Sequence, residues 1–325
     1  MRKGLADISY PTDLKLLNEA REKLEEIIDV LHEPHKGEQK KVRTYRQKAR
    51  KEYLKVAKKR RPSKQTIRAG IRKQLHYIAR NVRHIEALSR CEKFGQKSPL
   101  TRLSKRMYRN LLVIAELYRQ QRRMYEQRSH TVADRIVSIP QPHVRPIVRG
   151  KVNAKVEFGA KISVSMVDGY AFLEKLSWDA YHEAGELKKH IENYHRRFGY
   201  YPASVHVDGI YRNRENRAYC HTRGIHLAGS PLGRPPKNPT EYRRLLKGAK
   251  EAEIERVPIE GKFGNGKRNY GWSRITSKLK TTSESSITMT VLVMNLEKIL
   301  RDLLLSIFSL LRRLIFFRLN RRLFA

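Results

Sequence analysis

The fold is decided by the stretch ASVHVDGIYRNRENRAYCHTRGIHLAG, residues 203–229. It begins with a short apolar run that ends on Asp208-Gly209, continues through residues 213–223 with helical character, and closes with a second short apolar run. A strand, a helix and a strand in this order are typical of an α/β sheet. Asp208 would then stand at the end of its strand, where α/β sheets build ligand sites, although a lone acid there is as often a cap or loop residue.

The preceding region predicts further strands. Residues 156–176 alternate in character and contain Asp168-Gly169, a strong signal for a hairpin turn, so 155–167 and 170–176 should pair as antiparallel strands. Residues 135–140 read as another short strand, and 178–198 as a helix. Together with residues 203–229 this order predicts an α/β fold, a mixed sheet flanked by helices.

A long basic segment lies before these strands. Residues 36–128 carry thirty Lys and Arg against six acids, and their apolar residues recur at helical spacing. The whole chain has a net charge of +38, which indicates a polyanionic partner, DNA or RNA, whose phosphates would neutralise it. We therefore expect three or four helices whose basic faces contact DNA; a merely solvated helical insert is the alternative.

The chain ends suggest helices. Tyr10-Pro11-Thr12-Asp13 precedes a helical pattern, with Thr12 or Asp13 as N-cap. Residues 291–325 are rich in Leu, Ile and Phe but interrupted by charges, so we predict amphipathic core helices and no membrane span. Cys91 and Cys220 lack metal-ligand spacing, which fits a reducing cytoplasm. The predicted domains are 1–130 (basic, helical), 131–290 (catalytic core) and 291–325 (C-terminal helices).

Glu260 is the second acid of interest. Arg256 and Glu260 lie four residues apart, so on a helix they share a face, an arrangement that is most often a surface ion pair. Lys267 follows two turns later and would point the same way if one helix persisted through the glycines at 261, 264 and 266. Trp178 is predicted in the core, whereas Trp272 is left open between the core and stacking on a base.

These residues carry a resemblance to a known family. Arg256-(3)-Glu260-(6)-Lys267 keeps the spacing of the Tyr-(2)-Arg-(3)-Glu-(6)-Lys signature of insertion-sequence transposases, although Glu253 stands at the Tyr position. Residues 206–216 resemble the second-Asp motif of that family, and 225–235 the strand and loop after it. From about residue 8 to residue 300 the chain resembles bacterial insertion-sequence DDE transposases.

The resemblance implies an RNase H-like core that binds two Mg²⁺ (or Mn²⁺) ions, with the basic helical segment before or inserted into it. Asp208 and Glu260 would be two of three metal-ligating carboxylates, which suit hard, oxygen-seeking ions. Arg256, Lys267 and Arg234 would contact DNA phosphates. The implied reaction is phosphodiester cleavage and strand transfer at the ends of the element, by a homo-oligomer on DNA, in the cytoplasm at the nucleoid.

The first carboxylate of such a site is harder to identify. The family places it on a strand shortly before the segment that resembles residues 8–13, and here only seven residues precede it, with no apolar strand. Asp7 lacks that context, Asp13 is better explained as a helix cap, and Asp168 is a weak candidate in a turn. We therefore expect an N-terminally truncated transposase, active or inactivated by the missing Asp; the alternative is a non-catalytic nucleic-acid-binding protein.

Overall fold

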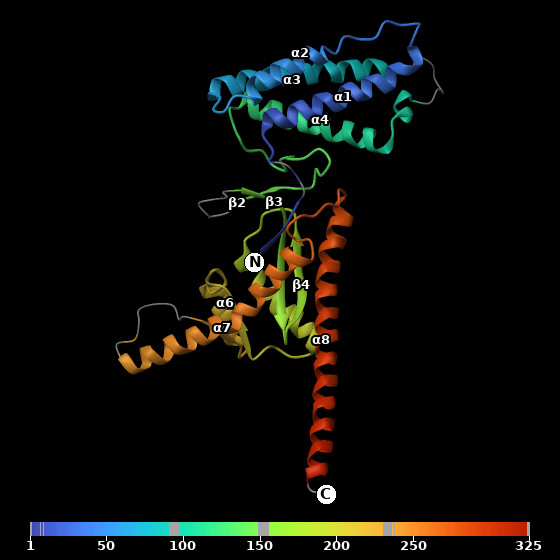
Figure 1. The fold of residues 1–325 in the computed structure, drawn as a ribbon. Coiled ribbons are helices and arrows are strands. Elements are labelled where there is room, and N and C mark those ends of the chain that lie inside the picture. The colour runs from blue at the N-terminus through green and yellow to red at the C-terminus, as the bar shows by residue number, and fades with distance from the viewer. Residues whose placement is uncertain are drawn as a thin grey trace. The chain divides into compact units, whose positions relative to one another are not determined.

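The computed structural model describes residues 2–6, 8, 10–90, 98–148, 156–229, 236 and 238–323 (Figure 1). The chain divides into two compact units. A helical unit comprises Asp7–Phe158, and a mixed unit comprises Met1–Ala6 and Gly159–Ala325. This division reflects packing alone, so the domain limits drawn from the sequence stay a prediction. Within the described part of the chain, no helix combines the length and the apolar character needed to cross a membrane.

The helical unit is built around its first helix, α1 (Asp13–His32), which packs against the three others. These are α2 (Arg46–Ala57), α3 (Lys64–Leu88) and α4 (Lys105–Glu126), joined by the short 3₁₀ turns η1 (Glu33–His35) and η2 (Pro99–Arg102). Their apolar faces enclose one core, whose most buried members include Leu17, Leu24, Ile28, Ile78, Ile114 and Leu117. The expected set of long helices in the basic segment is thus confirmed.

Polar side chains fix where these helices begin. The Thr12 hydroxyl accepts a hydrogen bond from the backbone N–H of Lys15 at 3.3 Å, which satisfies one donor of the first turn of α1. Asp13 instead accepts bonds from Gln121 at 2.8 Å and Arg135 at 2.6 Å. Asp13 therefore connects α1 to α4 and to the segment that follows it, and the helix cap is Thr12.

The mixed unit contains an antiparallel group of strands. It comprises β1 (Arg2–Leu5), β3 (Val156–Val167) and β4 (Tyr170–Ser177); β3 begins in the helical unit, where it pairs with β2 (Pro146–Val148). Both β1 and β4 are antiparallel to β3. The predicted hairpin is confirmed, with Asp168 (φ 49°) and Gly169 (φ 79°) in the left-handed conformations that a two-residue turn of this kind needs.

The decisive stretch forms two parallel strands, β5 (Ser204–His206) and β6 (His226–Ala228), around α6 (Arg214–Thr222). The turns η3 (Glu183–Glu186) and η4 (Gly209–Tyr211) and the helix α5 (Leu187–Phe198) complete this region. One core lies between these elements, formed by Leu187, Ile191, Tyr211, Cys220, Ile225 and Leu227. The fold therefore mixes helices with small sheets, which is compatible with the α/β class.

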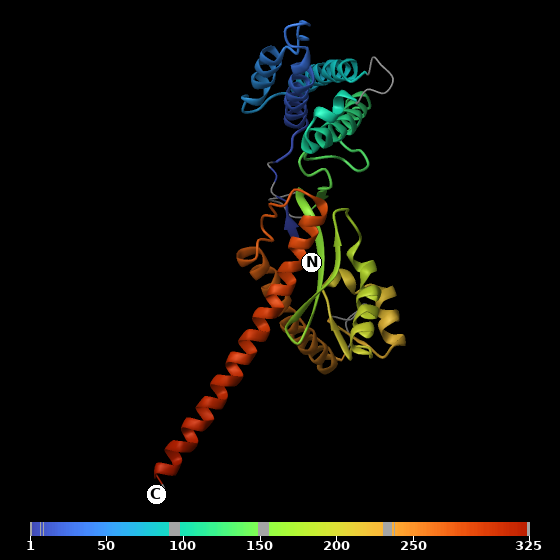
Figure 2. The ribbon, with the colours of Figure 1, turned by 90° about the vertical axis from the view of Figure 1, so that its right-hand side faces the viewer.

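Two long helices finish the unit. The first, α7 (Pro239–Asn269), is continuous through Pro258 and the glycines after it. The second, α8 (Lys280–Leu323), packs against β4 near its start, where Ile287, Val291 and Met294 are buried (Figure 2). From Leu296 to Leu311 its large apolar side chains are exposed. The prediction of C-terminal core helices is therefore wrong for this later part.

Two further differences concern strands. Residues 135–140 form no strand; Ile136 and Ile139 are buried in the core of the helical unit, so their apolar character reflects packing rather than pairing. Conversely, residues 2–5 do form a strand, because backbone pairing with β3 at 159–162 requires no apolar pattern. The sequence of β1, Arg-Lys-Gly-Leu, contains no carboxylate.

Candidate active site

Asp208 lies two residues beyond β5, on a loop that the core holds in place. Its carboxylate accepts a hydrogen bond from the backbone N–H of Gly209 at 2.8 Å and caps η4, and the residue is exposed. The loop is fixed by Asn216, which is 2% exposed and donates from Nδ2 to the carbonyl oxygens of Ala184 and Tyr211, both at 2.8 Å. The buried side chain of Asn216 thus fixes the backbone after Asp208, and the exposed carboxylate of Asp208 is held at the end of the strand.

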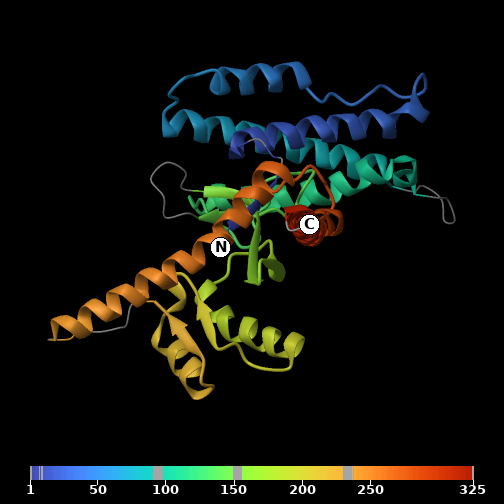
Figure 3. The same cartoon turned by 60° about the horizontal axis from the view of Figure 1, so that its bottom comes forward.

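The middle of α7 reaches the same end of the strands. α7 packs against both β5 and β6 (Figure 3). One contact is the pair between His206 Nε2 on β5 and Glu255 Oε2 on α7, 2.9 Å apart. Because β5 and β6 are parallel, their carboxyl ends lie at one edge, and α7 brings residues near 255 to it.

On α7, Arg256 is held between two acids. Its guanidinium donates to Glu253 and, at 2.8 Å, to Glu260. These bonds, first that to Glu253, raise the pKa of Arg256, so the side chain stays charged. The same contact with Arg256 lowers the pKa of Glu253, whereas the nearby charge of Asp208 acts in the opposite direction. Asp208 is therefore near enough to Glu253 to influence its ionisation.

A second arginine completes this cluster. Gly229, just beyond β6, has φ +117°, and a Cβ built on it would lie 1.9 Å from Nη1 of Arg212. The guanidinium of Arg212 therefore lies directly over the backbone of Gly229, a close approach that only glycine allows. The charge of Arg212 also lowers the pKa of Glu253. Arg212 and Glu253 were not predicted as site residues; the only hint was that Glu253 occupies a signature position.

The continuity of α7 also decides where Lys267 points. Arg256, Glu260 and Lys267 lie on one uninterrupted helix at spacings of four and seven residues, so they share a face. Past Glu260 the helix is anchored by close packing of Gly266 against Trp272. Trp272 is 3% exposed, so its alternative role in stacking on a base is wrong; Trp178, also buried, confirms its predicted core position.

The remaining candidates lie elsewhere or are not described. Asp168 occupies the β3–β4 turn. The pKa of Tyr194 in α5 is raised by burial and by Tyr200, and to a smaller extent by the negative charge of Asp168. Arg234 and Asp7 fall outside the described residues. Among the residues that the structure describes, no three His, Cys, Asp or Glu side chains gather as a metal site would require. The donor chemistry of Asp208, which is exposed, and of Glu260, which is half-buried, is that of carboxylate oxygens and suits Mg²⁺.

Comparison with known protein families gives one match. Residues 205–297 match the family model described as the transposase DDE domain. The match begins in β5, ends in α8 and includes Asp208, Arg256, Glu260 and Lys267. No curated protein and no solved structure matches the chain. The resemblance to insertion-sequence DDE transposases is thus confirmed over this stretch, which is similar to the transposase DDE domain.

Proposed function

We propose that the chain is a DNA transposase that cleaves phosphodiester bonds at the ends of an insertion sequence and joins them to target DNA. The observation that carries the proposal is that α7 packs against β5 and β6, with His206, two residues before Asp208, 2.9 Å from Glu255, inside the stretch that matches the transposase DDE domain. The resemblance implies that carboxylates at a strand end and on an adjacent helix hold the metal ions that act on the scissile phosphate.

The strand arrangement supports an RNase H-like core. Such a core is expected to be a mixed sheet flanked by helices, and here its antiparallel and parallel strands belong to two separate sheets. Here β1, β3 and β4 supply the antiparallel group, β5 and β6 the parallel pair, and α7 the helix. In this arrangement the helical unit is the insertion between β1 and β3, and β1 carries no carboxylate, so the first Asp of the family has no counterpart on this strand.

The chain's own residues would position DNA at this site. Arg256 is aligned by its two acidic neighbours and stays cationic, so it can hold a phosphate oxygen in a fixed geometry. Lys267, on the same helix face, would contact a phosphate further along the strand. Asp208 and Glu260 would hold Mg²⁺ or Mn²⁺, which when bound activates the attacking hydroxyl and stabilises the leaving oxygen.

The test measures cleavage and strand transfer with Mg²⁺ or Mn²⁺ on DNA that carries the terminal repeats flanking the chain's own gene. We expect Asp208→Asn and Glu260→Gln to abolish both reactions, whereas Glu251→Gln, an exposed acid on the same helix, leaves them unchanged. Equal activity in all variants would refute the assignment of the site.

A metal readout that needs no catalysis separates an inactive transposase from a DNA-binding protein without a metal site. Fe²⁺ in place of Mg²⁺ generates hydroxyl radicals from peroxide, which cut the polypeptide near the bound ion. The proposal expects cuts near residues 208 and 260 that excess Mg²⁺ suppresses and Asp208→Asn removes. Absence of cuts, together with DNA binding that ignores Mg²⁺ and Asp208→Asn, would favour the non-catalytic alternative.

The proposed partner besides DNA is a second copy of the chain, through α8. Apolar residues recur along α8 at alternating spacings of four and three: Met289, Val293, Leu296, Leu300, Leu303, Ile307 and Leu310. All seven are exposed. The helix face that packs on β4 is a different one, offset by two residues. A stripe of this period, with leucine at most of one set of positions, is typical of a coiled coil between like helices.

Sedimentation of the DNA-free chain tests this partner. The pair Leu296→Asp and Leu303→Asp should convert a dimer to a monomer, because it places charges in the stripe. Leu305→Asp is the control, since Leu305 is equally exposed, at 62%, but lies outside the stripe. A wild-type monomer, or equal dissociation by the control, would show that α8 does not pair in this way.

A further inference from the structure

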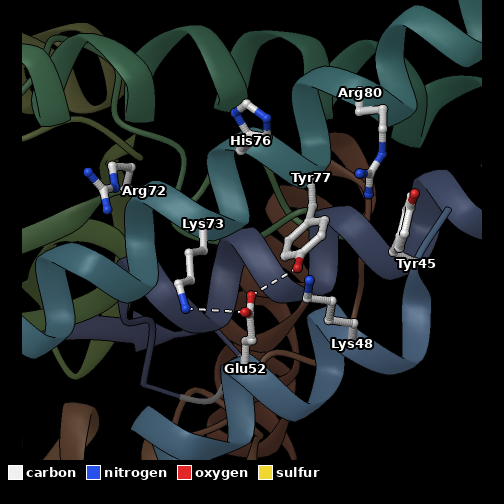
Figure 4. A pocket seen from close by; sticks show the side chains of 8 residues that line it. All are labelled: Tyr45, Lys48, Glu52, Arg72, Lys73, His76, Tyr77 and Arg80. Atoms are coloured by element: carbon white, nitrogen blue, oxygen red, sulfur yellow. Dashed lines mark hydrogen bonds and ion pairs between the residues drawn. The ribbon is translucent and has the colours of Figure 1, made fainter.

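A second polar site lies in the helical unit, on the face that α2 and α3 share. It is a cavity of about 440 Å³, within the size range of small-ligand sites. Residues at the start of α2 and along one face of α3 line it: Tyr45, Lys48, Glu52, Arg72, Lys73, His76, Tyr77 and Arg80 (Figure 4). The transposase DDE domain match does not extend to these residues.

The cavity carries a strong positive charge. Four cationic side chains line it, against the single carboxylate of Glu52. Glu52 accepts hydrogen bonds from Lys73 at 3.1 Å and from Tyr77 at 2.9 Å, and although burial acts to raise its pKa, these bonds lower it. The carboxylate is thus ionised and engaged within the wall, and the lining keeps a net positive charge that favours an anion.

Tyr45 gives the cavity an aromatic edge in a strained conformation. Its φ is 54°, in the left-handed region that bulky residues rarely adopt, and it is 46% exposed. The guanidinium of Arg80 lies 4.4 Å from the centre of its ring and is tied by a 3.1 Å bond to the carbonyl oxygen of Thr44. One ring face is therefore supported by a cation, while the exposed part of the ring is available to a planar ligand.

A phosphate next to a flat aromatic group is the chemistry of a nucleotide. We propose that this cavity binds one unpaired nucleotide of a DNA strand, with its phosphate near Lys48 and Arg72 and its base stacked on Tyr45. Strained backbone at an exposed tyrosine is the kind of feature that binding sites retain. The inference rests on the proposed function for its ligand, DNA, but concerns a surface separate from the carboxylates.

Fluorescence anisotropy of the full chain on a labelled 12-nucleotide single strand tests this site. EDTA in the buffer removes divalent ions, so the result does not depend on whether the carboxylate site works. Tyr45→Gly removes the ring and relieves the positive φ, and we expect it to raise Kd about fivefold to 150-fold, the range for loss of one stacked base. Tyr45→Phe keeps the ring and should bind as the wild type does.

The controls separate the cavity from the general basic charge. Tyr108→Ala removes a tyrosine that is equally exposed, at 44%, on α4, and should leave Kd unchanged. Arg72→Ala should reduce the slope of log Kd against log salt by about 0.7, one phosphate contact on a single strand, and more than Arg50→Ala on the outer face of α2. Equal effects of Tyr45→Gly and Tyr108→Ala, or equal loss on duplex and single strand, would overturn the proposal.

Discussion

Two glycines of the same helix, α7, should respond in opposite ways to the same substitution. A Cβ on Gly266 would lie 2.5 Å from Cε3 of Trp272 and 2.7 Å from Cε of Met294, both of which are buried. A Cβ on Gly261 would meet nothing within 4 Å. Alanine at either position gains up to about 1 kcal/mol of helix propensity. Only at Gly266 is this gain opposed by overpacking, which costs roughly 1–3 kcal/mol.

The difference between the two variants is therefore the overpacking alone, about 1–3 kcal/mol. Urea unfolding monitored by tryptophan emission measures this difference in the free energy of unfolding, because both tryptophans of the chain, Trp178 and Trp272, are buried in the mixed unit. With a urea slope of roughly 2 kcal/mol per molar, the midpoint of Gly266→Ala should lie about 0.5–1.5 M below that of Gly261→Ala. Gly261→Ala itself should be at least as stable as the wild type.

The result that would refute this reasoning is a Gly266→Ala midpoint equal to or above that of Gly261→Ala. The helix would then not be pressed against Trp272, and the argument that α7 runs unbroken from Arg256 to Lys267 would lose its anchor. Cleavage activity gives a second reading, since a displaced helix would also move Glu260. A loss of activity in Gly266→Ala but not in Gly261→Ala is therefore expected.

Three further outcomes follow from individual contacts. Asn216→Ala leaves two buried carbonyl groups without their donor, so urea unfolding should show a loss of about 1–3 kcal/mol, and cleavage should fall because the Asp208 loop is no longer fixed. Burial lowers the pKa of His190 below its ordinary value of 6.5. As pH falls, His190 therefore takes up a proton in the unfolded chain before it does so in the folded chain. Stability of the mixed unit should therefore fall as pH drops below 6.5, and His190→Gln should flatten this loss in urea titrations at several pH values. Asp168→Asn should preserve cleavage, since asparagine suits the left-handed turn, whereas Asp168→Val should cost about 1–2 kcal/mol on the same urea scale; loss of cleavage in the stable Asn variant would instead make Asp168 a ligand.

Local patterns in the sequence predicted the local structure well. The Asp168-Gly169 turn, the Thr12 cap and the strand ending near Asp208 depend on residues within a few positions of each other, so their outcome is decided nearby. Residues 135–140 show the opposite case. Their apolar side chains are required by the core of the helical unit, and no strand pairs with them among the residues that the structure describes, so tertiary packing overrides the β-like pattern.

Contacts distant in sequence could not be predicted in the same way. The spacing of Arg256, Glu260 and Lys267 indicated a common helix face, but nothing in it revealed that Arg256 would be shared between Glu260 and Glu253. The position of Arg212 over Gly229 depends on the pairing of β5 with β6, which no local pattern records. The later part of α8 has the apolar content of a core helix, but β4, the strand on which α8 packs, has only 8 residues against 44 in α8. The apolar side chains beyond the contact with β4, from Leu296 to Leu311, are therefore exposed.

The role of Glu253 follows from these distant contacts. In the transposase signature a tyrosine precedes the arginine by three positions, and here an acid takes that place and bonds to Arg256. Such a pair fixes the guanidinium when DNA is absent, but it also places a negative charge near Asp208, where a phosphate would have to approach. Neutral Glu253→Gln keeps an acceptor for Arg256 and removes that charge. It should therefore tighten DNA binding at the carboxylate site, measured without metal, whereas Glu251→Gln on the same helix should change it less; equal gains would mean that only net charge matters.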